Sequence, residues 1–329
     1  MKPFTKILSA IALTGALAGV NAAEVKIALD GPPNLEKSGS YVWAHTFGEA
    51  LKSGGFAVRE LPRGAVGGEA EKLDQAASGL LEVSLSDVKS VVRIEPFMVG
   101  VRLPYIFDDV AHMDRALAAG KVFDRVNAKL KDAGVRVIAL VPLGPPSGII
   151  NARKTVRTPA DMASLRMRAL DDAQLALYKA WGTNGTIVSW KEVPAALQTG
   201  VVDGYLNTAM VPLIFGQTDI VKFFTDARVI NALRAVIVSA AWYDGLSDAQ
   251  RKTVASAVAA ADKANRDWTA KISPKALADL EKAGVEVTRL TDAQRAAFRE
   301  KSRAVYGQGL LKPDQVKAWV DLAEKTRSK

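Results

Sequence analysis

The alternation of hydrophobic and polar residues predicts strands and helices that follow one another along the chain. Residues 24–29 (EVKIAL) alternate strictly, as expected for a strand with one buried face. A helix follows, because Trp43, Phe47 and Leu51 recur at helical spacing. Residues 134–141 (GVRVIALV) are apolar almost throughout, which is typical of a parallel strand covered on both faces. This succession of elements predicts the α/β class.

Residues 158–207 contain a strand that presents two arginines. In residues 165–170 (LRMRAL) the alternation places Arg166 and Arg168 on one face. A guanidinium stays charged at any relevant pH, and its planar fork matches a carboxylate. An arginine at a strand end is therefore suited to binding an organic anion. The alternative, two solvated surface arginines, remains open from the pattern alone.

Helix starts and a turn are predicted around this arginine strand. The capping-box pattern S/T-x-x-D/E begins at Thr158 and again at Ser189, and each instance predicts a helix that starts one residue later. Gly200 predicts the end of the second helix, because glycine readily adopts the left-handed conformation of a helix terminus. The turn that follows brings Tyr205 and Asn207 back towards the end of the arginine strand.

Composition narrows the possible functions. The 329 residues are 49% hydrophobic and 24% charged, which is ordinary for a globular protein with length for two domains. The chain has no cysteine, so disulfides and thiolate chemistry are excluded. Its two histidines, His45 and His112, have no partner at a metal-ligand spacing, and we expect no metal site. No G-x-S-x-G motif occurs, so we expect no enzyme; a secreted hydrolase remains a weaker alternative because carboxylates are plentiful.

The first 22 residues are typical of a signal peptide. Lys2 and Lys6 precede an apolar run over residues 7–20, and the small residues that end at Ala22 suit a cleavage site. Removing these two lysines changes the formal charge from +9 to +7. Export argues against nucleic acid as a partner, and no dense cluster of Lys and Arg favours it. We expect an exported protein whose positive field favours anionic ligands.

Two motifs resemble the periplasmic solute-binding subunits of TRAP transporters, the DctP-like family. In that family a strand D-x-x-G-hydrophobic-K-hydrophobic-R precedes the pattern E-x-x-x-A-L-Q-T-G-x-x-D-G-x-x-N. Residues 192–207 (EVPAALQTGVVDGYLN) match the second pattern without a gap. Residues 161–168 (DMASLRMR) match the first, except that Ser164 replaces the glycine. The resemblance extends over about residues 25–307.

The resemblance implies roles for individual residues. In the family, the last arginine of the first motif binds the substrate carboxylate and the final asparagine of the second contacts substrate, which implies these roles for Arg168 and Asn207. An acid at the end of an earlier strand meets substrate hydroxyl or amino groups in some members, and Asp87 holds this position, although a helix N-cap is an equal alternative. Trp190 lies where members often place an aromatic ring against the ligand; packing beneath the helix start is its alternative.

One expected arginine is missing. Family members usually carry a second arginine after the apolar strand, but this chain has residues 145–148 (PPSG) there and no arginine between Arg136 and Arg153. One guanidinium in place of two predicts a monocarboxylate, and Trp190 predicts an apolar or aromatic body for it. Further substrate-binding candidates are Asn34, in a loop after the first strand, Ser147 and Tyr205.

The resemblance implies a two-lobe periplasmic binding protein fold, with the ligand cleft between the lobes and a long helix crossing both. The helix begins near Leu246. We expect lobe I to contain residues 23–145 with 233–272, and lobe II to contain residues 146–232 with 273–329.

The implied function is that of a receptor that binds a small organic carboxylate. It would deliver this ligand to a TRAP membrane permease, with only peripheral contact to the membrane transporter and without a cofactor. A substrate-binding protein of an ABC importer remains an alternative, because it would use the same clamp.

Overall fold

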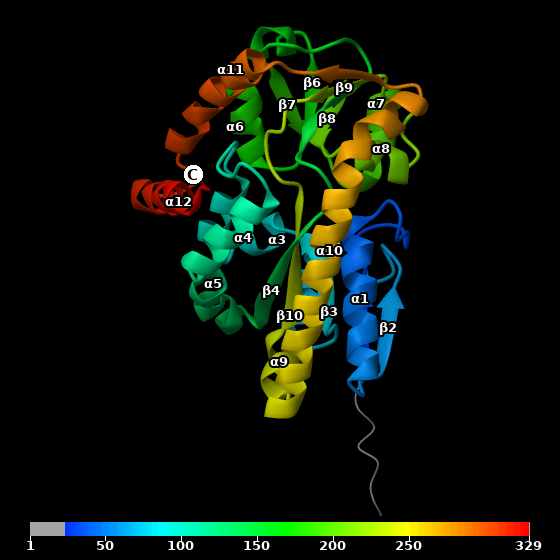
Figure 1. Ribbon diagram of the computed structural model, residues 1–329, viewed down its shortest axis with the longest axis vertical. Coiled ribbons are helices and arrows are strands. Elements are labelled where there is room, and N and C mark those ends of the chain that lie inside the picture. Colours follow the sequence, from blue (N-terminus) through cyan, green and yellow to red (C-terminus); the bar gives the residue numbers. More distant parts are fainter. Residues whose placement is uncertain (1–23, 329) are drawn as a thin grey trace, which may run out of the picture.

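The computed structural model describes residues 24–328, and it contains two β-sheets, each covered by helices (Figure 1). The predicted signal peptide, residues 1–22, lies outside the described residues. Within the described part, no helix combines the length and the hydropathy that crossing a bilayer requires. The two sheets and the long helix confirm the predicted α/β fold class with two lobes.

The first sheet has five strands, of which the antiparallel β10 enters late in the sequence. Their spatial order is β2 (Val58–Leu61), β1 (Val25–Ala28), β3 (Val83–Asp87), β10 (Leu233–Ser239) and β4 (Val135–Pro142). β10 is antiparallel to both of its neighbours, and its register sets Arg234 opposite Asp87. Opposite charges at facing positions stabilise a strand pair. This register therefore places an ion pair at the end of β3.

Helices cover both faces of the first sheet. One face packs on α4, α5 and η1, and the other packs on α1 and the first half of α10. The helical elements of this half are α1 (Gly39–Ser53), α2 (Glu69–Ala77), α3 (Lys89–Val92), η1 (Pro96–Arg102), α4 (Val110–Ala119), α5 (Val122–Leu130), η2 (Lys131–Ala133) and α9 (Ala240–Gly245).

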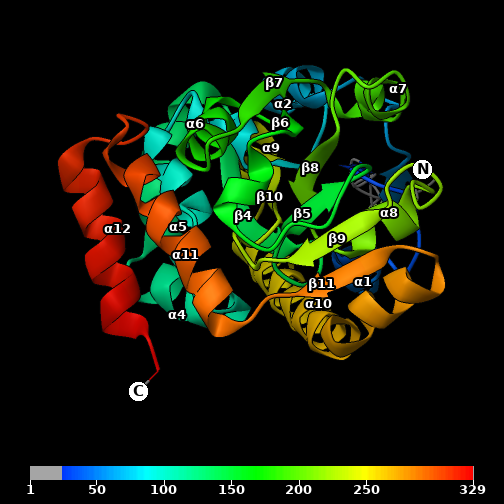
Figure 2. The same cartoon turned by 90° about the horizontal axis from the view of Figure 1, so that it is seen from above.

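The second sheet has six strands and contains the arginine strand. Their order is β11 (Glu286–Arg289), β9 (Phe223–Asp226), β5 (Gly148–Asn151), β8 (Gly204–Asn207), β6 (Arg166–Ala169) and β7 (Asn184–Ile187). Figure 2 shows β9, β5 and β8 side by side across this half of the molecule. β6 lies parallel to β8, with Arg168 opposite Tyr205. The predicted return of the chain beside the arginine strand is thus confirmed.

The helices of the second half begin where the caps predict. The 3₁₀ turns η3 (Pro159–Met162) and η4 (Trp190–Glu192) start at the predicted residues, and Gly200 follows the second helix with a φ of 71°. The elements around the second sheet are η3, α6 (Asp172–Ala180), η4, α7 (Val193–Gln198), α8 (Met210–Ile214), α11 (Asp292–Ser302) and η5 (Arg303–Gly307).

The long helix α10 (Asp248–Lys282) passes both sheets (Figure 1). Ser247 caps it, accepting a hydrogen bond from the backbone of Gln250. Its first half contributes Ala257 to the core beside α1, and its second half contributes Ala276 to the core of the second sheet. One rigid element therefore contacts both lobes, as predicted.

The last helix, α12 (Pro313–Thr326), packs on the first lobe. Trp319 is fully buried, stacks on Phe97 and donates a hydrogen bond to the carbonyl of Phe97 at 2.9 Å. Figure 1 shows α12 beside α4. The predicted boundary, which gave residues 273–329 to lobe II, differs from the structure here, because the apolar face of α12 is covered by the helices of lobe I.

Candidate ligand-binding site

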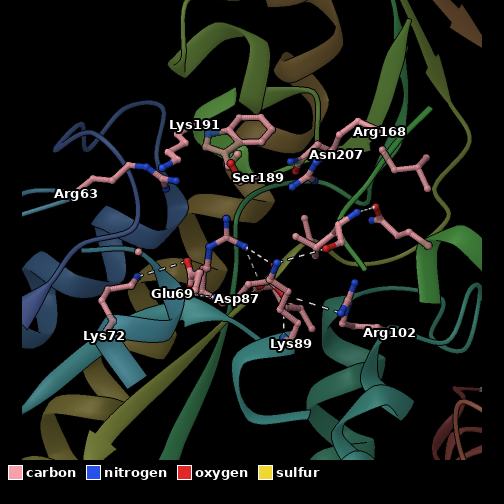
Figure 3. A pocket seen from close by; sticks show the side chains of 18 of the residues that line it. Arg63, Glu69, Lys72, Asp87, Lys89, Arg102, Arg168, Ser189, Lys191 and Asn207 are labelled. Carbon is pink, nitrogen blue, oxygen red and sulfur yellow. Dashed lines mark hydrogen bonds and ion pairs between the residues drawn. The ribbon is translucent and has the colours of Figure 1, made fainter. Parts of the chain in front are cut away.

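A cavity of about 630 Å³ lies between the two sheets and is lined by residues of both (Figure 3). Its lining within residues 24–328 holds more cationic than acidic side chains. The cations are Arg63, Lys72, Lys89, Arg102, Arg168, Lys191 and Arg234, and the acids are Glu69, Glu71 and Asp87. A cleft lined by one sign of charge concentrates ligands of the opposite sign. The cavity is therefore suited to an anion.

Arg168 is a nearly buried guanidinium of the cavity lining that has no carboxylate partner among the described residues. It ends the arginine strand β6, is only 4% exposed, and donates from Nε to the carbonyl of Val188 at 2.9 Å. Among the residues that the structure describes, no carboxylate lies within 4.0 Å of its guanidinium. Burial lowers the pKa of Arg168, but a guanidinium still remains charged near neutral pH. A nearly buried cation without a partner carboxylate is a binding point for a ligand anion.

Asn207 and Trp190 lie near this guanidinium, and Ser147 lines the same cavity. Figure 3 shows Asn207 beside Arg168; its side-chain oxygen accepts from the backbone of Thr208 at 3.0 Å, which leaves its amide hydrogens free to donate to a ligand. The Arg168 guanidinium lies 5.7 Å from the centre of the Trp190 ring, close enough for a cation–π interaction. Ser147 lines the cavity and is 1% exposed. These contacts provide polar donors and one apolar face.

Arg234 and Arg102 also line the cavity, but carboxylates already match their charges. Arg234 lies 2.6 Å from Asp30 and 3.1 Å from Asp87. Arg102 lies 2.6 Å from Asp171 and 4.0 Å from Asp87. Burial raises the pKa of Asp171, but the Arg102 charge and hydrogen bond outweigh it, so the net pKa is lowered and the carboxylate stays ionised.

Asp87 makes a cap-like contact and also lines the cavity, so both interpretations of the sequence remain compatible with its position. One carboxylate oxygen accepts from the backbone of Lys89 at 2.9 Å, a cap-like contact at the start of α3. The other accepts from Arg234 at 3.1 Å. Its side chain still lines the cavity (Figure 3).

The remaining cations are held by backbone groups or lie at the mouth of the cavity. Lys72 donates to the carbonyl of Leu85 at 2.6 Å and lies 3.5 Å from Glu69. Lys89 donates to the carbonyl of Leu170 at 3.3 Å. Arg63 and Lys191 are exposed, and Figure 3 shows them near each other, away from Arg168.

Two predicted site residues lie outside the lining of the cavity. The side-chain oxygen of Asn34 accepts from the backbone of Glu36 and Lys37, both at 2.9 Å, so this residue fixes its own turn. Tyr205 is fully buried behind Trp190, and its hydroxyl donates to Gln217. Both residues contribute to local structure, Asn34 through its side-chain oxygen and Tyr205 through its hydroxyl.

The expectation of a single guanidinium in the site is wrong. In the described part of the chain the cavity lining includes Arg63, Arg102, Arg168 and Arg234. Residues 145–148 do not supply the second arginine that family members usually carry after the apolar strand. The other guanidiniums of the cavity come from other elements of the fold. Sequence reasoning missed Arg102 and Arg234 because nothing in their local pattern marks them, and only the register of β10 against β3 places Arg234 at the cavity.

Arg166, the other arginine of β6, is not part of the lining. Its guanidinium pairs with Asp203 at 2.9 Å, and Arg153 pairs with the same carboxylate. Asp203 is buried, and the hydrogen bonds from Arg166 hold the pKa of its carboxyl well below the usual range. Arg166 thus fixes the turn before β8, while Arg168 lines the cavity.

Comparison with known proteins identifies the family. A profile of DctP, the bacterial extracellular solute-binding protein family 7, matches residues 36–311. The chain belongs to this family. The resemblance to solute-binding subunits of TRAP transporters, seen in two short motifs, is thereby confirmed over most of the sequence.

Curated relatives of this DctP-family chain are distant but cover most of its length. The 2,3-diketo-L-gulonate-binding periplasmic protein YiaO of Escherichia coli is 25% identical over 274 residues, which are 82% of each chain. The ectoine/5-hydroxyectoine-binding periplasmic protein UehA of Ruegeria pomeroyi is 26% identical over 270 residues, covering 80% of this chain and 79% of UehA.

Solved structures share the fold. A sugar-acid-binding protein from Advenella mimigardefordensis, in complex with galactonate, has a TM-score of 0.84 at 19% identity and covers 93% of this chain and 99% of its own. A TRAP solute-binding protein from Roseobacter denitrificans with bound β-D-glucuronate has a TM-score of 0.82 at 24% identity, covering 92% and 100%. At these identities the likeness establishes the architecture of the DctP-family chain, and its ligand must be argued from its own residues.

Proposed function

We propose that this protein is a periplasmic receptor that binds a small monocarboxylate and delivers it to a TRAP-type permease. The observation that carries the proposal is Arg168, a guanidinium 4% exposed, in a cavity between the lobes, without a carboxylate within 4.0 Å among the described residues. Its fork would bind the ligand carboxylate in a bidentate manner, and the Asn207 amide would donate to the same group.

The ion pairs that the lining guanidiniums already make indicate the charge of the ligand. Although several guanidiniums line the cavity, carboxylates already match Arg102 and Arg234. Arg168 is the buried one that is available, so one carboxylate suffices to complete the site. This argument supports the monocarboxylate predicted from the sequence, for a different physical reason from the one first given.

The body of the ligand would meet two kinds of surface. Trp190, Leu206 and Ile230 supply apolar contacts, while Asp87 and Lys89 supply polar ones. We propose an acid with an apolar face towards Trp190 and a hydroxyl or keto group towards Asp87. The named relatives, which bind diketogulonate, glucuronate or galactonate, are consistent with an oxygen-bearing acid.

Delivery would depend on closure of the two lobes around the ligand. A ligand that contacts both lobes stabilises the closed state over the open one. The permease would recognise the closed form, and the ligand would leave unchanged. Family membership favours a TRAP permease over an ABC importer as the partner.

A thermal-shift panel tests the proposal. Purified mature protein is heated with aliphatic, keto, hydroxy and aromatic monocarboxylates, and a ligand at about 100 times its Kd should stabilise the fold by about 2.7 kcal/mol. Each compound that raises Tm is then titrated by calorimetry against Arg168→Ala. The proposal fails if no carboxylate raises Tm, or if the variant binds with near-native affinity.

A further inference from the structure

One ion pair at the cavity joins the two lobes. Arg102 ends η1 on the first lobe, and Asp171 precedes α6 on the second. Their side chains are 8% and 23% exposed, and Arg102 Nη1 lies 2.6 Å from Asp171 Oδ2. Lys89 of the first lobe makes a second contact to this segment, donating to the carbonyl of Leu170 at 3.3 Å (Figure 3). Arg102 and Lys89 of the first lobe line the cavity here, and Asp171 of the second lobe pairs with Arg102 without itself lining the cavity.

Asp171 makes two separable contacts. Its Oδ1 accepts from the backbone of Gln174 at 3.1 Å, which caps α6, while its Oδ2 accepts from Arg102. An asparagine at this position keeps a side-chain oxygen for the cap and loses the charge. The structural contribution of Asp171 can thus be retained while its electrostatic contribution is removed.

Building on the proposed function, we propose that Asp171 is a specificity-determining residue that excludes dicarboxylates. Its carboxylate already occupies Arg102, the guanidinium that a second ligand carboxylate would otherwise bind in the closed receptor. Asp87, which lies 4.0 Å from Arg102, adds a second negative charge on the same side.

The exclusion rests on charge. A diacid anchored at Arg168 would bring its second carboxylate towards groups that Asp171 and Asp87 have already matched, and like charges brought together disfavour the wrong partner. Replacing Asp171 by asparagine changes the charge of the site by one unit. The variant site carries one negative charge fewer, which offsets the additional negative charge of the second ligand carboxylate.

The test compares equal-length monoacids and diacids. The probe pairs are butanoate with succinate, hexanoate with adipate, and gluconate with glucarate, each titrated by calorimetry. The variants are Asp171→Asn and, should that variant fold poorly, Asp171→Ser, whose hydroxyl also caps a helix. The matched control is Asp109→Asn, because Asp109 caps α4 by accepting from the backbone of His112 at 2.7 Å and, among the described residues, makes no ion pair with an arginine of the cavity lining.

The measured quantity is the ratio of diacid affinity to monoacid affinity within a pair. A lost contact between the lobes lowers the affinity for both acids and leaves this ratio unchanged. Removal of a repulsive charge changes the ratio, because it raises the affinity for the diacid alone. We expect the wild type to prefer the monoacid, and the Asp171 variant to raise the ratio by about tenfold or more while Asp109→Asn leaves it unchanged.

Two results overturn the inference and leave the proposed function standing. One is a wild type that binds a diacid as tightly as its monoacid. The other is an Asp171 variant whose ratio of diacid affinity to monoacid affinity equals that of the wild type. Failure of the wild type to bind any carboxylate of the monoacid panel would instead refute the proposed function, and the inference with it.

Discussion

Replacing Arg168 by methionine should separate ligand binding from stability. The side chain is 4% exposed, and its Nε donates to the carbonyl of Val188 at 2.9 Å. Breaking a buried ion pair by removing one partner costs about 3–5 kcal/mol. Ligand affinity should therefore fall by about two to four orders of magnitude. A ligand bound at micromolar concentration by the wild type would need about 0.1 to 10 mM.

The ligand-free variant should nevertheless keep its stability. Methionine removes a buried charge whose partner the described residues do not provide, and replacing buried charges by apolar side chains of similar size is often neutral or stabilising by about 1–4 kcal/mol. The lost hydrogen bond to Val188 offsets about 1.5–3 kcal/mol of this gain. We therefore expect an unchanged or slightly raised Tm without ligand, together with loss of the ligand-induced shift.

The control is Arg166→Met, two residues earlier on the same strand. Arg166 is half exposed, pairs with Asp203 and does not line the cavity, so this variant should bind ligand normally. Calorimetry and urea unfolding of both variants measure the two effects. Affinity of Arg168→Met within about threefold of the wild type, or a loss of more than about 2 kcal/mol of unfolding free energy, would refute the reasoning.

Two further predictions concern the fold. Asp203→Asn should lower the unfolding free energy at pH 7 by about 1–3 kcal/mol, because the ionised Asp203 carboxylate stabilises the folded state. Since its pKa is lowered on folding, this stabilisation is present above the ordinary carboxyl pKa and is lost as pH falls through the folded-state pKa. Urea unfolding should therefore show a smaller difference between wild type and variant at pH 3 than at pH 7, and an equal difference would contradict this assignment. Trp319→Ala should cost about 3–5 kcal/mol, because it removes a fully buried ring stacked on Phe97; a thermal unfolding midpoint within about 2 °C of the wild type would contradict the placement of α12.

Periodicity predicted most of the fold because most elements bury one face. The strand around Arg168, the helix starts at residues 159 and 190, and the long helix all follow from local patterns that the structure confirms. The docking of α12 could not be predicted in this way. An amphipathic helix shows that one face is buried, but not which lobe covers it.

Five of the predicted site residues line one cavity, namely Arg168, Asn207, Trp190, Asp87 and Ser147. The resemblance to the family suggested the first four, whereas no motif marked Ser147. The loop residue Asn34 was misplaced, because an asparagine in a turn often bonds its own backbone, and its sequence context looks the same in either case. Tyr205 was misplaced because the alternation of a strand does not show which face meets the ligand.

Pairing over long sequence distances explains what local patterns could not show. Arg102 and Asp171 are 69 residues apart in the sequence, and Arg234 and Asp30 are 204 apart. Counting the arginines of one segment therefore gave the wrong number of guanidiniums, although it led to the same ligand charge that we propose from the ion pairs. The relevant number is that of buried guanidiniums without a carboxylate partner, which depends on the register of β10 and on the approach of the two lobes.

The position of Asp171 also determines when ligands are distinguished. Because Arg102 and Asp171 belong to different lobes, opening of the lobes would separate their ion pair. A diacid that meets the open first lobe would then encounter Arg102 with only Asp87 as a nearby negative charge. Closure then brings the Asp171 carboxylate against the second carboxylate of the ligand, so the closed state gains less free energy than it does with a monoacid. Discrimination should therefore appear mainly in the closing step and in the dissociation rate, while encounter with the open receptor remains similar for both acids.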